Sequence, residues 1–240
     1  MTDQPPRRLS RFSHVLFDLD QTLATYALTT SDIVSVVWNR LAISPDEVGP
    51  PTELAARYDA LWVRLERSAS SGEALRRSIW SSVLRERGQT SPSLAERIAA
   101  EHGALRRSTG ARLLEGVVEL LSNLRGAGYG LGLLTNGLSD VQWEKIRALR
   151  VDVLVDQVSV AGDTGVYKPD PQAFRDLLSR LDAAAETSLF VGDSYEADVV
   201  GAIDCGMAAA WVRPSGTPVP GPHVPGFAVE RATDLRSVLL

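Results

Sequence analysis

The chain has 240 residues, which suits a core domain with an insertion rather than two full domains. Hydrophobic residues make up 44% and charged residues 23%, the balance of a globular chain with a sizeable core. The formal net charge of −5 argues against a nucleic-acid polymer or an anionic membrane as the main partner. The single cysteine, Cys205, excludes an internal disulfide and fits a reducing compartment. Because the sequence shows neither a signal-peptide pattern nor a membrane-spanning run, we expect a cytoplasmic location.

The first predicted element is a strand in HVLF, which runs directly into DLDQT. Asp18 and Asp20 are two residues apart, so on an extended chain their side chains point the same way. Converging carboxylates repel each other and lose hydration, which is unfavourable unless a cation is present. The end of this strand is therefore a candidate for a charged site.

Residues 26–108 show four amphipathic helical patterns and no strand. The fourth helix is predicted to start near Ser93, because Ser93 and Glu96 have the spacing of a capping box. Helices with one apolar stripe each pack against one another, so we expect a separate α-helical cap domain. Three of the five tryptophans fall in this stretch and are interpreted as core residues: Trp38, Trp62 and Trp80.

From residue 113 onward, helices alternate with strands predicted in YGLGLLTNG, DQVSVAG, TSLFVGD, MAAAWV and FAVE. Strands separated by helices imply a parallel sheet that is covered on both faces. The predicted fold class is α/β, a Rossmann-like doubly wound parallel sheet with an inserted α-helical cap. We expect a catalytic core at residues 1–25 and 109–240 and the cap at 26–108.

Polar residues follow three of the predicted strands: Asp18 and Asp20, Thr135 and Asn136, and Asp193 and Ser194. In an open parallel sheet, ligands bind beyond the carboxyl ends of the strands. Asp198 lies about one helical turn after Asp193 and belongs to the same region. Oxygen ligands without histidine or cysteine suit Mg²⁺, and Lys168 adds a positive charge. Together these groups suit a phosphate. Taken singly, each is an ordinary turn former, helix cap or solvated lysine, and capping is a sufficient role for Ser194.

The segments DLDQT, LLTNG, GVYKPDPQAF and VGDSYEADVVGA resemble, in this order, the four motifs of the haloacid-dehalogenase superfamily of hydrolases. The resemblance covers the opening strand and residues from about 113 to 213, and the helical insert is similar to that of members with a first-type α-helical cap. The four motifs are specific for the superfamily and weak for any one substrate. Gln21 departs from the pattern, since many members have glycine there, and we interpret it as a variation in the turn.

The resemblance implies that Asp18 is a nucleophile that forms an aspartyl-phosphate and that Asp20 is the general acid and base. It implies an Mg²⁺ site made by Asp18, the Asp20 carbonyl, Asp193 and Asp198, the last directly or through water. It implies further that phosphoryl oxygens are held by Thr135 and the amide of Asn136, while Lys168 offsets the charge of nucleophile and phosphate. Dehalogenases of this superfamily lack an aspartate two residues after the nucleophile, so Asp20 favours a phosphatase.

The expected substrate is a small phosphorylated metabolite. The pattern is most similar to pyrimidine 5′-nucleotidases and N-acylneuraminate-9-phosphatases, so a nucleoside 5′-monophosphate is the leading hypothesis and a sugar phosphate the alternative. A phosphomutase uses the same intermediate and stays open, whereas a 2-haloacid dehalogenase or an inactive binding protein is less favoured. Three histidines lie outside the motifs and are interpreted as structural or exposed: His14, His102 and His223.

Overall fold

The structure is a computed structural model that describes residues 11–240. The chain divides into two compact units. One unit comprises the segments up to Thr25, Leu113–Asn136 and Leu149–Leu240, and it contains the main sheet. The other, which we call the helical unit, comprises Tyr26–Arg112 and Gly137–Ala148. Residues 137–148 thus group with the helical unit, although their sequence pattern placed them in the catalytic core.

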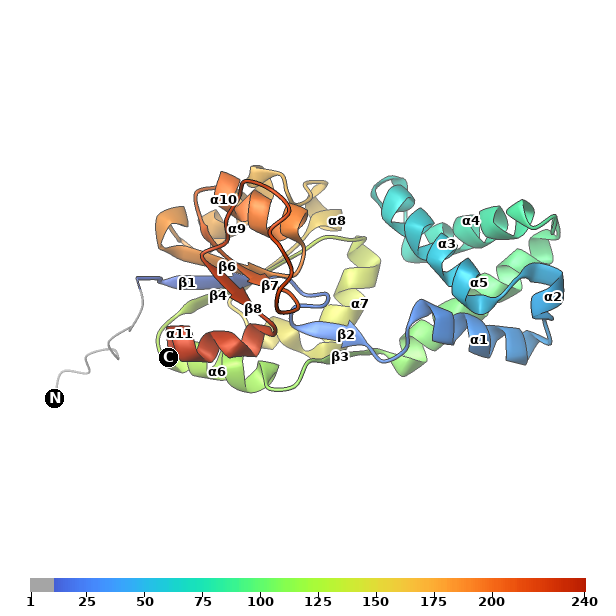
Figure 1. The fold of residues 1–240 in the computed structure, drawn as a ribbon, viewed down its shortest axis with the longest axis horizontal. Coiled ribbons are helices and arrows are strands. Elements are labelled where there is room, and N and C mark those ends of the chain that lie inside the picture. The colour runs from blue at the N-terminus through green and yellow to red at the C-terminus, as the bar shows by residue number, and fades with distance from the viewer. Residues whose placement is uncertain (1–10) are drawn as a thin grey trace. The chain divides into compact units, whose positions relative to one another are not determined.

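The main sheet is parallel and has the strand order β5-β4-β1-β6-β7-β8, which confirms the predicted fold class (Figure 1). Phe17, the last residue of β1, pairs with Leu133 of β4 on one side and with Val191 of β6 on the other. Asp18 therefore leaves the middle of the sheet at its carboxyl edge. The strands are β1 His14–Phe17, β4 Gly130–Thr135, β5 Gln157–Val160, β6 Ser188–Gly192, β7 Ala208–Val212 and β8 Phe227–Val229.

Helices cover both faces of this sheet, α9 and α10 on one face and α6 and α11 on the other (Figure 1). Because both faces are covered, a central strand can be apolar throughout, and β6 is buried along its whole length. The helices are α6 Val117–Gly126, α8 Ala161–Thr164, α9 Pro171–Arg180, α10 Gly201–Asp204 and α11 Arg236–Leu239. A π-helical segment, Tyr195–Val200, leads into α10, and 3₁₀ turns lie at Val151–Val153, Ala185–Thr187 and Ala232–Leu235.

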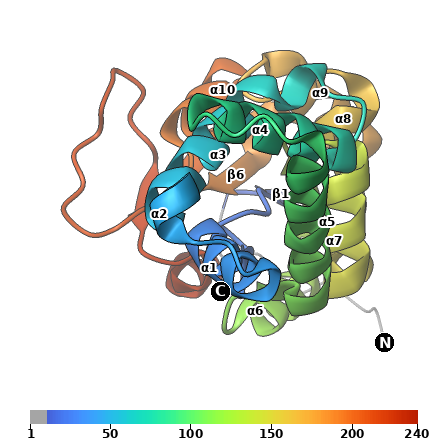
Figure 2. The same cartoon turned by 90° about the vertical axis from the view of Figure 1, so that its right-hand side faces the viewer.

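The helical unit is built around one apolar core, with its helices visible in Figure 2. Trp38 and Trp80 are buried in this core as predicted, whereas Trp62 is only partly buried at its edge. The helices are α1 Thr30–Leu41, α2 Pro45–Val48, α3 Pro51–Leu65, α4 Gly72–Glu86, α5 Pro92–Thr109 and α7 Ser139–Leu149, with a 3₁₀ turn at Glu66–Ser68.

The helix α5 starts at Pro92, near Ser93 as predicted, but the predicted capping residue was wrong. Ser91 is the residue that caps this helix, and its hydroxyl accepts a hydrogen bond from the backbone N–H of Leu94 at 3.4 Å. Pro92 then occupies the first helical position, where its missing N–H is not needed. Ser93 lies inside the helix, so the capping-box spacing with Glu96 pointed to the wrong serine.

The helix α7 joins the helical unit through a side-chain cap on α4. The Asp140 carboxylate accepts a hydrogen bond from the backbone N–H of Gly72, the first residue of α4, at 2.9 Å. A carboxylate at this end of a helix is stabilised by the unpaired N–H groups and by the helix dipole. A Cβ at Gly72 would lie 2.4 Å from the Val141 side chain, so the glycine permits this close approach. These contacts explain why residues 137–148 belong to the helical unit.

Two short strands, β2 Ala24–Tyr26 and β3 Ala111–Leu113, form a separate two-stranded sheet where the chain leaves and re-enters the unit with the main sheet. A long Pro/Gly-rich loop after β7 projects from that unit and is the orange-red excursion in Figure 2. Tyr195 holds this loop, because its hydroxyl donates to the His223 carbonyl at 3.1 Å. Among residues 11–240, no helix combines the length and hydrophobicity that crossing a membrane would require.

Candidate active site

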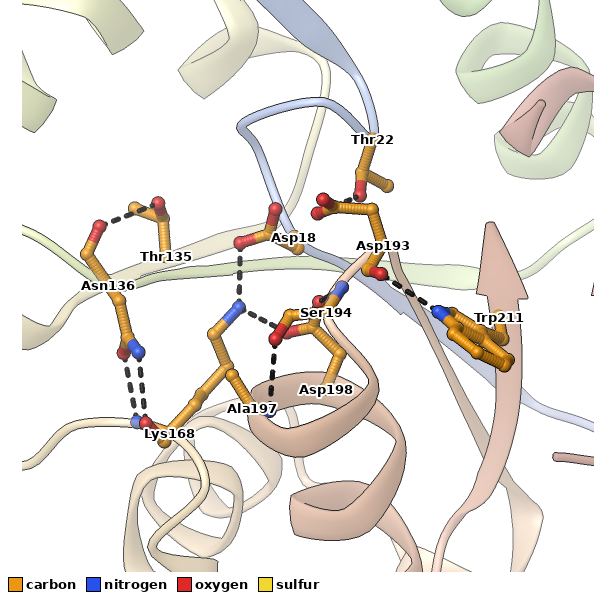
Figure 3. A network of polar contacts seen from close by, with 10 residues as sticks. All are labelled: Asp18, Thr22, Thr135, Asn136, Lys168, Asp193, Ser194, Ala197, Asp198 and Trp211. Atoms are coloured by element: carbon orange, nitrogen blue, oxygen red, sulfur yellow. Dashed lines mark hydrogen bonds and ion pairs between the residues drawn. The ribbon is translucent and has the colours of Figure 1, made fainter. Parts of the chain in front are cut away.

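The site centres on a buried lysine between two carboxylates at the carboxyl edge of the sheet (Figure 3). Lys168 Nζ lies 2.6 Å from Asp18 Oδ1 and 2.7 Å from Asp198 Oδ1. Only 2% of the Lys168 surface is exposed, and its ammonium also lies 5.1 Å from the Phe190 ring centroid. Two anions around one buried cation leave an excess of negative charge, which a second cation would neutralise.

Asp198 is fixed from two directions. Its Oδ1 faces Lys168, and its Oδ2 accepts a hydrogen bond from the backbone N–H of Ser194 at 2.9 Å. The absence of a side chain at Gly192 makes room for it, because a Cβ there would lie 2.2 Å from Asp198 Oδ2. Ser194 acts as the helix cap that the sequence suggested, since its hydroxyl accepts from the Ala197 N–H at 3.2 Å.

Asp193 approaches the same site from the end of β6. The Thr22 hydroxyl donates to Asp193 Oδ1 at 3.3 Å, a long and therefore weak bond that leaves the carboxylate available to other partners. Trp211 of β7 holds the backbone, because its indole N–H donates to the Asp193 carbonyl at 2.8 Å. Thr22, Trp211 and Gly192 are supporting residues to which the sequence analysis gave no role. Thr22 and Gly192 lie within the segments DLDQT and VGDSYEADVVGA, so the sequence did hold a signal for them, whereas the role of Trp211 depends on the register of β6 with β7.

Asn136 links two of the predicted motifs through the backbone of Lys168. Its amide group donates to the Lys168 carbonyl and accepts from the Lys168 N–H, each at 2.9 Å. This pair of bonds fixes the segment that carries Lys168 against the end of β4. Thr135, the last residue of β4, is 1% exposed, and its hydroxyl donates to the Asn136 carbonyl at 3.2 Å. The four segments that carry the motifs therefore meet at one edge of the sheet.

Asp20 lies in a tight turn just beyond β1. An isolated bridge joins Asp20 to Ala24, and the Gln21 N–H donates to the Ala24 carbonyl at 2.7 Å. Gln21 has φ of 60°, in the left-handed region that glycine adopts at little cost. This conformation explains why glycine suits the position, and it shows that the backbone of the turn forms with glutamine as well.

Burial raises the pKa of Asp18 to about 7, with Lys168 acting in the opposite direction and Asp198 and Asp20 adding to the rise. Burial and the neighbouring Asp198 likewise raise the pKa of Asp193 to about 6. For Lys168, burial favours the neutral form, but the two carboxylates outweigh it and raise its pKa above the usual value. Each shift has the direction expected when several acids share one poorly hydrated site.

Asp18, Asp193 and Asp198 each offer a carboxylate oxygen, and these three oxygens lie within 4.8 Å of one another. Such a set of hard oxygen donors fits Mg²⁺, which keeps several waters and needs few protein ligands. The donor set therefore fits the expected metal on chemical grounds. Asp198 already has a partner for each oxygen, so of the three it is the one suited to binding a metal through water.

The chain matches the family model described as haloacid dehalogenase-like hydrolase over residues 12–206. It is 33% identical to a phosphoserine phosphatase of Thermus thermophilus, covering 76% of this chain and 73% of that protein. It is 30% identical to the human N-acylneuraminate-9-phosphatase, covering 96% and 95% of the two chains. These matches confirm the predicted enzyme class, a phosphoric monoester hydrolase of this family.

The HAD-hydrolase YfnB of Bacillus subtilis is 25% identical over 96% of this chain and 97% of its own length. Its crystal structure, described as bound to magnesium, superposes with a TM-score of 0.73 at 22% identity and covers 96% of this chain and 99% of that one. The structural likeness supports the fold, and the family follows from the sequence match and from the four motifs at one sheet edge. The chain belongs to the haloacid dehalogenase-like hydrolase family.

Proposed function

We propose that the protein is an Mg²⁺-dependent phosphatase that hydrolyses a small phosphate monoester through an intermediate on Asp18. The observation that carries this proposal is the contact of Asp18 with Lys168 inside a cluster of three convergent carboxylates. A carboxylate nucleophile needs a neighbouring positive charge to accept a dianionic phosphoryl group, and Lys168 supplies one. A binding protein on an inactive scaffold would have no need to keep this costly arrangement.

In the first step, an Asp18 oxygen attacks phosphorus, and the ester P–O bond breaks. The leaving oxygen takes its proton from Asp20. In the second step, water gives a proton to Asp20 and attacks the same phosphorus, which releases phosphate and restores the Asp18 carboxylate. Asp20 is suited to this shuttle because its carboxylate is not one of the three grouped carboxylates, so the group that carries the proton is distinct from the side chains proposed to bind the metal.

The Mg²⁺ ion would be held by Asp18, Asp193 and the Asp20 carbonyl, with Asp198 acting through water. When bound, it neutralises charge on the phosphoryl oxygens. Thr135 and the backbone N–H of Asn136 would bind phosphoryl oxygens at the end of β4. Lys168 contacts Asp18 directly and therefore stabilises negative charge at the attacked position.

The substrate is the least constrained part of the proposal. The nucleoside 5′-monophosphate suggested by the motif pattern remains one candidate. The phosphoserine and N-acylneuraminate phosphatases among the relatives favour a second candidate, a phosphorylated amino acid or sugar. Both candidates share the phosphoryl end, which is all that the carboxylate cluster would contact. A phosphomutase would require the intermediate to return its phosphoryl group to an organic acceptor instead of water.

The proposal is tested by assaying purified protein against nucleotides, sugar phosphates and phosphorylated acids, with Mg²⁺ or with excess chelator. We expect hydrolysis of at least one monoester, loss of turnover in chelator and its return on adding Mg²⁺. Asp18→Asn should reduce kcat by roughly 10⁴-fold or more, as for other nucleophile substitutions, while the far-UV spectrum stays unchanged. Turnover that survives the chelator, or an active Asp18→Asn protein, would refute the proposal.

A further inference from the structure

The indole of Trp211 is bonded to the backbone that carries one of the site's carboxylates. Trp211 pairs with Gly192 across β6 and β7, and only 6% of its surface is exposed. Its N–H donates to the Asp193 carbonyl at 2.8 Å (Figure 3). A buried indole N–H usually finds an acceptor, so this bond alone would also suit a purely structural residue. The peptide group that provides the acceptor gives the bond a wider effect.

The peptide group between Asp193 and Ser194 is held at both ends. Its carbonyl accepts from Trp211, and its N–H, on Ser194, donates to Asp198 Oδ2 at 2.9 Å. Because a trans peptide group is planar, its carbonyl and its N–H point in opposite directions and cannot turn independently. The bond from Trp211 therefore orients the N–H that holds Asp198, and it also fixes the backbone from which the Asp193 carboxylate extends.

The hydrogen bonds continue from Asp198 to the proposed nucleophile. Lys168 Nζ donates to Asp198 Oδ1 at 2.7 Å and to Asp18 Oδ1 at 2.6 Å. Lys168 and Asp198 are both buried, and linked hydrogen bonds in a poorly hydrated site strengthen one another by polarisation. An unbroken series of hydrogen bonds thus leads from the Trp211 indole, through one peptide group and two side chains, to Asp18 (Figure 3).

The ring of Trp211 is itself fixed by its neighbours. The Tyr195 ring lies 5.2 Å from it, centroid to centroid, at an interplanar angle of 55°. The Cζ of Arg213 lies 4.9 Å from the Trp211 ring centroid, a distance typical of cation–π contacts. The Tyr195 hydroxyl donates to the His223 carbonyl and accepts from the His223 N–H, each at 3.1 Å, which ties Tyr195 to the Pro/Gly-rich loop. These contacts hold the indole in the orientation from which its N–H reaches the Asp193 carbonyl.

We propose that Trp211 is a positioning residue that orients the Asp193 and Asp198 carboxylates through the Asp193–Ser194 peptide group. The inference rests on the proposed function where it concerns Mg²⁺, whereas the coupling of Trp211 to the peptide group is a property of the metal-free protein. Residues that orient metal ligands typically change metal affinity by roughly 10–100-fold when they are replaced. Loss of the Trp211 N–H should therefore weaken Mg²⁺ binding while the nucleophile stays in place.

The coupling is tested on the intact protein without Mg²⁺, by following exchange of the Ser194 amide proton with deuterium by NMR. Trp211→Phe removes the indole N–H and keeps an aromatic ring beside Tyr195. Its matched control is Trp38→Phe, which removes a buried indole whose N–H donates to the Gly49 carbonyl at 3.4 Å in the helical unit. We expect Ser194 to exchange about tenfold faster or more in Trp211→Phe and within about twofold of the wild-type rate in the control. A wild-type rate in Trp211→Phe would overturn the inference.

A second variant separates the N–H group from the packing of the ring. Replacing Trp211 by 3-benzothienylalanine puts sulfur in the place of the indole N–H and keeps the shape of the side chain. It should speed the exchange of the Ser194 amide as Trp211→Phe does, with Tm close to that of the wild type. Wild-type exchange in this protein would show that only the shape of the ring matters, and the inference would fail.

Mg²⁺ affinity is measured separately, by calorimetric titration of each protein with MgCl₂. Trp211→Phe should bind Mg²⁺ about tenfold more weakly or worse, and Trp38→Phe should match the wild type. Equal Mg²⁺ affinities for wild type and Trp211→Phe would refute the positioning role at the metal site. If the wild-type protein itself binds no Mg²⁺, the proposed function is wrong, and the Ser194 exchange rates alone decide whether Trp211 positions the two carboxylates.

Discussion

The Asp198 carboxylate occupies the space that a side chain at Gly192 would fill, with Oδ2 only 2.2 Å from the ideal Cβ position. This contact ties the end of β6 to the helical segment that follows it. Gly192→Ala should therefore displace Asp198 from both Lys168 and the Ser194 N–H. Because a misplacement of about 1 Å in a catalytic site can cost roughly 10²-fold, we expect kcat/KM to fall by about that factor.

The measurement is kcat/KM for p-nitrophenyl phosphate together with the Mg²⁺ concentration for half-maximal activity. Gly126→Ala is the matched control, because a Cβ at that glycine would have no atom within 4 Å. The control should retain full activity. A Gly192→Ala enzyme with normal kcat/KM and normal Mg²⁺ dependence would show that the position of Asp198 is unimportant.

Lys168→Met removes the cation between Asp18 and Asp198 and leaves two buried carboxylates facing each other. Breaking a buried ion pair in this way typically costs roughly 3–5 kcal/mol, so Tm should fall markedly in the absence of Mg²⁺. Added Mg²⁺ should restore part of the loss, since it replaces one positive charge. Arg125→Met, which breaks the exposed contact with Asp156, should cost at most about 1 kcal/mol and show no Mg²⁺ rescue. Equal Tm values for wild type and Lys168→Met would contradict this reading.

The strands of the main sheet and the site residues at their ends could be predicted from the sequence, because both are marked by residues close together in the chain. Asp18 and Asp193 each follow a strand whose apolar run is easily recognised, Thr135 ends another, and parallel strands bring their carboxyl ends to one edge. The hydrogen bond of Trp211 to the Asp193 carbonyl depends instead on the register of β6 with β7, which no local pattern determines. The grouping of α7 with the helical unit likewise depends on a contact between Asp140 and Gly72, residues far apart in the chain.

The substitution Gln21→Gly tests whether the backbone conformation of the turn after β1 is strained. The φ of 60° at Gln21 costs a non-glycine residue roughly 1–2 kcal/mol, partly offset by the greater freedom of glycine in the unfolded chain. Gln21→Gly should therefore raise the free energy of unfolding by up to about 1 kcal/mol, measured by urea denaturation. Its kcat/KM should stay within twofold of wild type, because within residues 11–240 the side chain forms its hydrogen bonds with Thr25 and with none of the site residues. A destabilised variant would indicate that the glutamine side chain, and not the backbone, determines the turn.

His102 should make the helical unit sensitive to acid. Its Nδ1 accepts a hydrogen bond from the Trp80 indole N–H at 3.2 Å, and burial with two nearby arginines lowers its pKa from 6.5 to about 2. The unfolded chain thus binds a proton that the folded chain does not between these pH values. The resulting stability is fully present above pH 6.5 and is lost by up to about 1.4 kcal/mol per unit as pH falls below it.

This pH dependence is measured by urea unfolding followed through tryptophan fluorescence between pH 7.5 and 4.5. His102→Gln, which can accept the same indole hydrogen bond without titrating, should show a flatter profile below pH 6.5. Other groups contribute equally to both proteins, so the difference between the two profiles isolates His102. Parallel profiles over this range would show that the histidine is already protonated in the folded state.

The most direct test of the account is chemical identification of the phosphorylated residue. Borohydride added during turnover reduces an acyl phosphate, and reduction of an aspartyl-phosphate leaves homoserine in place of the aspartate, which peptide mass spectrometry locates. We predict homoserine at position 18 only when an active monoester and Mg²⁺ are present, and none in Asp18→Asn. Steady hydrolysis with an unmodified Asp18, or reduction at a different residue, would contradict the central claim that Asp18 is the nucleophile.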